Sequence, residues 1–143
     1  MKKIIKSKKA PEAKGPYSHA ILHDHKYTME LSGQIGINPK TGKLTEGIVM
    51  QTEQTFANIN SILEEVGWDT NNLVKVRVLL ADMKDYGIVN EVYSTFFPGN
   101  FPARVAVAVK ELPLGALIEI DCTAAGDKIN NWVVHTNHNI LNI

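Results

Sequence analysis

The amino-acid sequence predicts an α+β fold, in which two helices pack on one face of a mixed β-sheet. Residues 27–32, 73–80, 103–109 and 117–124 either alternate with a period of two or are almost wholly apolar, as is typical of strands. Residues 46–66 repeat apolar side chains every three or four positions, which is typical of an amphipathic helix. The expected order is β-β-β-α-β-α-β-β, a two-layer α+β arrangement.

Glycine, proline and helix-capping residues indicate where the remaining strands, loops and helix ends lie. A short lysine-rich edge strand is expected at 3–8, and a loop at 11–18, where two prolines and a glycine occur. Gly67 is a natural end for the first helix, because glycine accepts the left-handed conformation found there. Asp82 is expected to cap the second helix, which ends before Pro98.

The last two strands carry the most informative charged residues. We expect strands 103–109 and 117–124 to form a hairpin, because a turn-like Glu-Leu-Pro-Leu-Gly segment joins them. Arg104 shares a face with the small Ala106, so space lies beside its planar cation, and Glu119 would lie one strand away. This pattern favours a site for a small carboxylate ligand. An ion pair between Arg104 and Glu119 on the sheet surface is the simpler interpretation of the same spacing.

Composition limits the classes of protein that are compatible with the chain. Its 143 residues favour one domain, and its 15 basic and 15 acidic residues give no net charge. Neither nucleic acid nor an anionic membrane surface is therefore expected as a specific partner. No stretch approaches the ~20 apolar residues of a membrane span. Cys122, the one cysteine, lies on the apolar side of its strand and fits a reducing, cytoplasmic compartment.

The predicted helices can cover only one face of the sheet. Strands 73–80 and 103–109 are nevertheless apolar on nearly both sides, and such strands are usually covered on both faces. We therefore expect burial against other copies in a closed homo-oligomer. Residues 127–143 have five asparagines and no clear period, so we expect them to form an extension outside a domain of residues 1–126.

No metal site is expected from the spacing of potential ligands. The histidine pairs at 23 and 25 and at 135 and 138 lack further ligands at recognisable distances along the chain. Gly33-x-x-Gly36 is not followed by a lysine or a helix, so it is expected to be a strand bend and not a phosphate loop.

Seven motifs resemble, in the same order, those of the RidA family, which is also called the YjgF family. They are Ala-Lys-Gly-Pro-Tyr-Ser-His-Ala (13–20), Ser-Gly-Gln-Ile-Gly (32–36), Asn-Pro-Lys-Thr-Gly (38–42), Gln-Thr-Phe-Ala-Asn-Ile (54–59), Val-Asn-Glu-Val-Tyr-Ser-Thr-Phe-Phe (89–97), Phe-Pro-Ala-Arg-Val (101–105) and Leu-Pro-Leu-Gly-Ala-Leu-Ile-Glu-Ile (112–120). The resemblance covers residues 1–126.

This resemblance implies a chorismate-mutase-like fold and a homotrimer with clefts between its subunits. It also implies hydrolysis of 2-imino or enamino acids, such as 2-iminobutanoate and 2-iminopropanoate, to 2-oxo acids and ammonia. No metal or organic cofactor is implied. Because pyridoxal-phosphate-dependent dehydratases release these short-lived species, the resemblance implies a functional link to such enzymes.

The same resemblance assigns roles to individual residues. It implies that Arg104 clamps the substrate carboxylate and that Glu119 holds the attacking water. Ala106 stands where many members have cysteine, so the preferred substrate side chain is left open. The implied substrate-binding residues are Tyr17, Ser32, Gly33, Asn90, Arg104 and Ala106.

Two alternatives to a deaminase are compatible with the same motifs. One is a non-catalytic module that binds 2-oxo acids or related metabolites in the same clefts. The other is an endoribonuclease or translation inhibitor, an older label of the family. The neutral charge of the chain disfavours the second alternative, although six of the thirteen lysines lie within residues 1–14.

Overall fold

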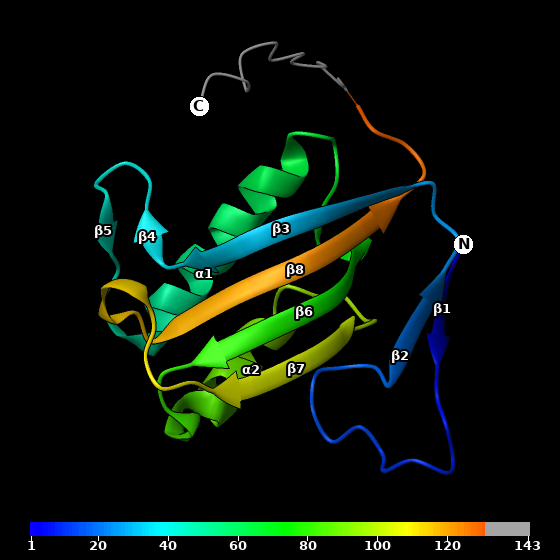
Figure 1. Cartoon of the computed structure of the whole chain (residues 1–143), viewed down its shortest axis with the longest axis horizontal. Coiled ribbons are helices and arrows are strands. Elements are labelled where there is room, and N and C mark those ends of the chain that lie inside the picture. Colours follow the sequence, from blue (N-terminus) through cyan, green and yellow to red (C-terminus); the bar gives the residue numbers. More distant parts are fainter. Residues whose placement is uncertain (131–143) are drawn as a thin grey trace, which may run out of the picture.

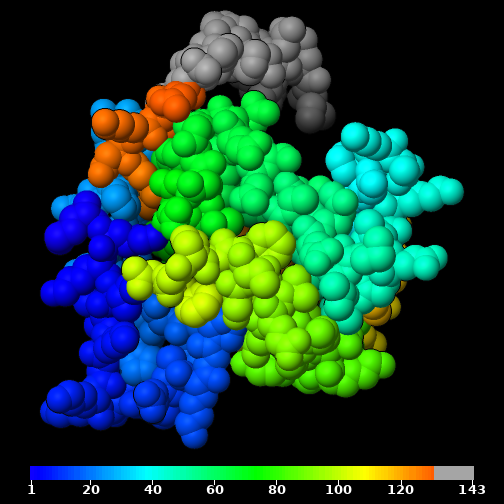
Figure 2. All heavy atoms as spheres, turned by 180° about the vertical axis from the view of Figure 1, so that it is seen from behind, coloured from blue at the N-terminus to red at the C-terminus, as the bar shows by residue number. Residues whose placement is uncertain are grey.

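The computed structural model describes residues 1–130 and confirms the predicted α+β class. A four-stranded mixed sheet has both helices on one of its faces (Figure 1), and the helix-covered side is seen in Figure 2. From edge to edge the strands are β3 (Tyr27–Ile35), β8 (Ile118–Gly126), β6 (Leu73–Leu80) and β7 (Ala103–Ala108). The helices are α1 (Gly47–Glu64) and α2 (Tyr86–Ser94).

The predicted hairpin of strands 103–109 and 117–124 is wrong. Strand β7 pairs in parallel with β6, and β8 lies between β6 and β3, antiparallel to both. The reason is the connection through α2, which carries the chain back over the sheet and thereby makes β6 and β7 parallel neighbours. Strand β8 pairs with the other edge of β6. Glu119 is consequently two strands away from Arg104, not one.

The core confirms the periodicities predicted from the sequence. Val76, Val78 and Leu80 of β6 are fully buried beneath the helices, while the residues between them are more exposed. On α1, Phe56 is fully buried, and its ring stacks on that of Phe96 with centroids 4.3 Å apart. Apolar burial of this kind is the main force that holds the two layers together.

The predicted end of the first helix at Gly67 is confirmed, whereas Asp82 caps a short turn before α2 and not α2 itself. Gly67 has φ +77° just beyond α1, where a side chain would be strained. Asp82 accepts a hydrogen bond from the backbone N–H of Lys84 at 2.8 Å. It caps a short 3₁₀ turn (Met83–Asp85) that leads directly into α2.

The N-terminal residues form a hairpin outside the main sheet. Strand β1 (Lys2–Ile5), shorter than the predicted 3–8, pairs with β2 (Ala20–His23), a strand that the sequence did not reveal (Figure 1). A single bridge between Ser18 and Ala103 joins this hairpin to the edge of β7. A second small hairpin, β4 (Ile37–Asn38) with β5 (Lys43–Leu44), follows β3.

The sheet face away from the helices mixes charged and apolar side chains. Arg77 of β6 makes an ion pair with Asp121 of β8 at 2.7 Å. Beside them, Val105 and Val107 of β7 are 39% and 41% exposed. An open patch of valine on an edge strand is the kind of surface that other protein surfaces cover. The homo-oligomer nevertheless stays a prediction.

The first residues of the predicted extension lie against the domain. Trp68 Nε1 donates to the carbonyl of Lys128 at 2.6 Å, and the N–H of Asn130 donates to the carbonyl of Val66 at 2.9 Å. The rest of the extension, with the histidines at 135 and 138, lies outside the described residues, so the division at residue 126 stays a prediction. Within residues 1–130, no helix is long and apolar enough to cross a membrane, and no cluster of three potential metal ligands occurs.

Candidate active site

Arg104 is held at the edge of the sheet by neutral side chains of α2. Its Nη1 donates to Asn90 Oδ1 at 2.8 Å, and its Nη2 donates to the Tyr86 hydroxyl at 3.4 Å. Within residues 1–130 no carboxylate pairs with this guanidinium. A half-buried arginine without a counter-ion is suited to receive an anionic ligand. The predicted ion pair with Glu119 is therefore wrong.

Aromatic rings surround the same guanidinium. The ring centroids of Tyr93, Tyr17 and Tyr86 lie 4.9, 5.7 and 5.8 Å from Arg104 Cζ, within the range of cation–π attraction. The loop that carries Tyr17 passes close by, because a Cβ placed on Gly15 would lie 3.6 Å from Arg104 Nη2. The rings and the loop restrict the orientation of the cation while leaving other N–H groups available.

Tyr93 forms the buried floor of this cluster. Its side chain is fully buried, and burial raises the pKa of its hydroxyl well above the usual range. That hydroxyl has no hydrogen-bond partner within the described residues. Tyr93 therefore supports Arg104 through its ring, and its hydroxyl stays protonated at neutral pH.

A second group of predicted site residues lies around Glu119 on β8. The carboxylate of Glu119 packs over Gly33 on β3, so closely that a Cβ on Gly33 would overlap it. The pairing of β3 with β8 shifts register between Leu31 and Gln34, which leaves Ser32 and Gly33 outside the regular ladder. The predicted strand bend is thereby confirmed, and it exposes Ser32 and Gly33 beside the carboxylate.

The two groups lie on opposite faces of the sheet. Arg104 contacts α2 on the helix-covered face, and Ala106, two residues further on β7, faces the same way and packs against the core. On β8 the buried neighbours Ile118 and Ile120 point toward the helices, so Glu119 between them points away. Within one chain, Arg104, Asn90 and Tyr17 therefore lie together, and Ala106 is on the same face of the sheet. The second group, which contains Ser32, Gly33 and Glu119, lies apart from them.

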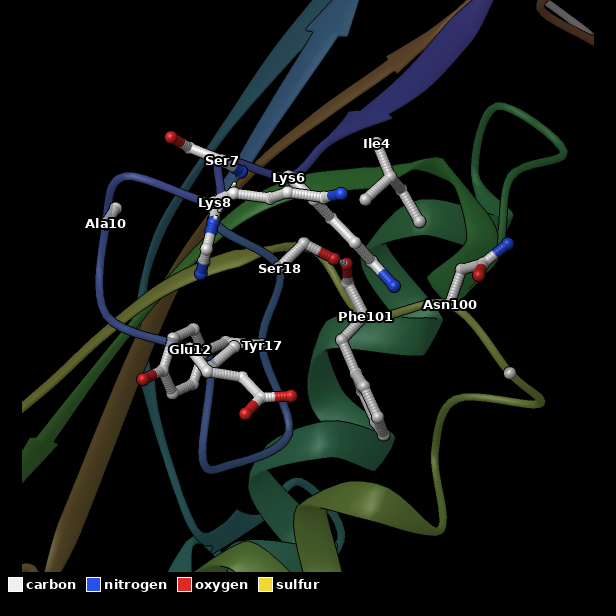
Figure 3. Close-up of a pocket in the computed structure, with 13 residues that line it drawn as sticks. Ile4, Lys6, Ser7, Lys8, Ala10, Glu12, Tyr17, Ser18, Asn100 and Phe101 are labelled. Carbon is white, nitrogen blue, oxygen red and sulfur yellow. Dashed lines mark hydrogen bonds between the residues drawn. The ribbon is translucent and has the colours of Figure 1, made fainter.

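A cavity of about 590 Å³ adjoins the arginine cluster (Figure 3). Its walls come from the N-terminal segment, where Lys6 and Lys8 lie, and from Asn100 and Phe101 before β7. Tyr17 lines this cavity and also packs against Arg104, with its ring centroid 5.7 Å from Arg104 Cζ.

Cys122 is a core residue, as its place in the sequence predicts. It is 3% exposed, and burial raises the pKa of its thiol to about 12, with a smaller contribution from Asp121. The thiolate, which is the reactive form, is therefore scarce in the folded protein at neutral pH.

We expect a thiol reagent at pH 8 to label Cys122 only after the chain is unfolded in denaturant. An unfolded chain ionises this thiol near pH 9, whereas the folded chain keeps it protonated. Stability from this group is consequently present below that pH and is lost as the pH rises further. Mass spectrometry of labelled protein checks the first expectation, and rapid labelling of native protein would contradict the burial described here.

The sequence analysis did not identify Tyr86 or Tyr93 as site residues. The signal was present, because Tyr86, Asn90 and Tyr93 recur at intervals of four and three residues and so share one face of a helix. Because Asn90 lies near Arg104, this spacing predicts that both tyrosines lie there as well. The structure adds these two residues and Gly15 to the predicted set.

The sequence and the fold are similar to those of known proteins. The family model described as endoribonuclease L-PSP matches residues 7–126. A mouse protein named 2-iminobutanoate/2-iminopropanoate deaminase is 46% identical over 125 residues, which are 87% of this chain and 91% of the mouse protein. The crystal structure of RidA from the Antarctic bacterium Psychrobacter sp. PAMC 21119 has a TM-score of 0.68 at 40% identity, covering 86% of this chain and 98% of that one.

The crystal structure of the YjgF gene product from E. coli has a TM-score of 0.67 at 36% identity, and covers 86% of this chain and 98% of that one. The chain is thus an α+β protein with the fold of these solved structures. It belongs to the endoribonuclease L-PSP family, which includes RidA, as its motifs predicted.

Proposed function

We propose that this protein is a hydrolytic deaminase, which converts reactive 2-imino and enamino acids to 2-oxo acids and ammonia. The observation that carries the proposal is Arg104, a cation that has only neutral partners within residues 1–130. We infer the substrates, 2-iminobutanoate and 2-iminopropanoate, from the name of the mouse relative. Dehydratases that depend on pyridoxal phosphate are the proposed source of these compounds.

The proposed reaction needs a fixed substrate and a positioned water. Charge-assisted hydrogen bonds from Arg104 to the substrate carboxylate would fix the adjacent imine carbon. Water attacks that carbon, a C–O bond forms, and the Glu119 carboxylate takes the proton that the water releases. That proton then returns to nitrogen, and Glu119 takes the proton of the new hydroxyl as the C=O bond forms and the C–N bond breaks, which yields the 2-oxo acid and ammonia.

Glu119 is proposed to act on water and not on substrate affinity. We expect Glu119→Gln to slow imine hydrolysis by about 10²–10⁴-fold, the usual contribution of a positioned acid or base. Calorimetry should show that the variant binds a 2-oxo acid about as tightly as the original protein does. Lost binding with an unchanged rate of hydrolysis would contradict this role. The measurement of imine hydrolysis also tests the non-catalytic alternative. If the protein shortens the lifetime of the imine, that alternative is wrong.

Because Arg104 and Glu119 face opposite sides of one sheet, we propose that each cleft is shared by two chains. Strands β7 and β3 form the two edges of the sheet, with Arg104 on the first and Gly33, under Glu119, on the second. A head-to-tail contact that joins these edges closes into a ring when the rotation allows. It would also cover the exposed Val105 and Val107.

The smallest such ring that the family resemblance supports is a homotrimer. Light scattering at micromolar concentration should therefore give a mass about three times that of the 15.8 kDa chain. A monomer at the concentration of the activity assay would contradict the shared cleft, because each chain alone keeps the two groups apart.

A further inference from the structure

The cavity of about 590 Å³ beside the arginine cluster has no part in the proposed reaction (Figure 3). Its volume lies within the range of about 300–1,000 Å³ that is typical of pockets for small molecules. Residues of the N-terminal segment form most of its lining, and Asn100 and Phe101, between α2 and β7, form the rest. The cavity is therefore large enough to hold a ligand of its own.

The positive charge of the cavity lining comes from Lys6 and Lys8. Neither lysine makes an ion pair within residues 1–130. His19 also lines the cavity, and its Nδ1 accepts a hydrogen bond from the backbone N–H of Ser7 at 3.1 Å. The neutral imidazole ring therefore has its proton on Nε2, from which it can donate.

This set of groups suits a phosphate monoester better than a carboxylate. A phosphate monoester carries a charge of about −1.5 to −2 at neutral pH and has three strong acceptor oxygens. Lys6 and Lys8 supply two positive charges, and His19 supplies a further N–H donor. A carboxylate has one negative charge, so it would leave one of the two ammonium groups without a partner.

Aromatic and apolar side chains form another part of the lining. Tyr17 and Phe101 are half-buried, and both line the cavity together with Ile4. Aromatic side chains of this kind stack with flat ligand rings, largely independently of the ring's polar substituents. A ligand that combines a phosphate with a flat ring would contact both the lysines and the aromatic side chains.

Glu12 adds one carboxylate to the lining, and Figure 3 shows it across the cavity from Lys6. No ion pair joins Glu12 to Lys6 or to Lys8, so the positive and negative groups are separate. An α-amino acid fits this arrangement poorly, because both of its charges are attached to one carbon atom. A ligand with a phosphate at one end and an N–H donor at the other can contact both.

We propose that this cavity is a second binding site, which takes a free phosphate monoester of a flat ring that carries an amino group, such as a purine nucleoside monophosphate. Lys6, Lys8 and His19 hold the phosphate. The ring lies against Tyr17 and Phe101, and Glu12 accepts a hydrogen bond from the amino group. The site does not include Arg104, and the proposal does not depend on imine hydrolysis.

Calorimetry with adenosine 5′-monophosphate (AMP) tests the proposal, and inorganic phosphate and adenosine measure the contributions of the two parts. We expect AMP to bind with a micromolar Kd, about ten-fold or more tightly than either part alone. Undetectable binding of AMP at millimolar concentration would overturn the proposal. Equal binding of AMP and inorganic phosphate would overturn it as well, because the ring would then contribute nothing.

Variants of the lining show where AMP binds. Lys6→Gln and Lys8→Gln should each weaken the binding of AMP by about ten-fold, the loss expected for one charge-assisted hydrogen bond. Lys9→Gln is the matched control, because Lys9 is an exposed lysine of the same segment that does not line the cavity. Arg104→Ala should leave the affinity for AMP unchanged. Loss of AMP binding in this variant only would assign the ligand to the arginine cluster and overturn the proposal.

Two further ligands test the chemistry of the ring and the source of the phosphate. Inosine 5′-monophosphate has a carbonyl oxygen where AMP has its amino group, so it should bind several-fold more weakly, and Glu12→Gln should remove this difference. Equal affinities in the original protein would overturn the role of Glu12. A short oligoadenylate should bind no more tightly than AMP. Binding that is about ten-fold tighter would indicate a site for an RNA strand and overturn the assignment to a free nucleotide.

Discussion

Replacement of Arg104 by lysine is expected to lower imine hydrolysis by about ten- to hundred-fold, nearly as much as replacement by alanine. Lysine keeps the positive charge but loses the planar group that can donate to Asn90, to Tyr86 and to a carboxylate at once. Charge-assisted hydrogen bonds of this kind contribute about 1.5–3 kcal/mol, which corresponds to the expected loss. Steady-state kinetics with 2-iminopropanoate measures it.

A suitable control is Lys40→Gln, which removes a cation from an exposed turn far along the chain from β7. Its activity should equal that of the original protein. Melting temperatures show whether either Arg104 variant is merely unfolded. If the lysine variant is folded and turns over at the original rate, the cation acts without its directional hydrogen bonds, and the carboxylate clamp is wrong.

Mixing two inactive variants is expected to restore activity. Arg104→Ala and Glu119→Gln each destroy every cleft in their own oligomer, because each cleft needs both residues. When the two are unfolded together and refolded in equal amounts, about one cleft in four combines an intact Arg104 from one chain with an intact Glu119 from the next. Turnover should therefore recover to about a quarter of the original value.

Refolding each variant alone is the control, and each should keep only its own residual activity, at most about a tenth of the original. The experiment depends on the arrangement of the two residues on opposite faces of the sheet. If both residues of a cleft came from one chain, no mixed oligomer would contain a complete cleft, and activity would stay at the level of the separate variants. That result would require a large rearrangement of β7 or β8 from the structure described here.

Local patterns in the sequence predicted the elements well and their neighbours poorly. The alternation of Ile118, Ile120 and Cys122 with Glu119 and Asp121 correctly assigned the two faces of β8. The same pattern could not tell which strands flank β8, because strand order depends on how connections cross the sheet. Strand β2 was missed because four residues without a fully buried side chain give little periodic signal.

The candidate site was predictable in parts for the same reason. Arg104 and Ala106 share a face because of a two-residue period, which is local information. The separation of Arg104 from Glu119 follows from the insertion of β8 between β3 and β6, which involves contacts between residues far apart in sequence. Tyr86 was missed because its role depends on a hydrogen bond to a residue eighteen positions later.

The central position of β8 has a consequence for synthesis of the protein. Strands β3 and β6 do not pair with each other; each pairs with β8, which is the last strand within the described residues. Until this segment has left the ribosome, the growing chain exposes an unpaired edge of β3 and an unpaired edge of the largely apolar β6. Folding of the sheet therefore waits until β8 has left the ribosome, and until then the open strand edges are sites where chaperones can bind.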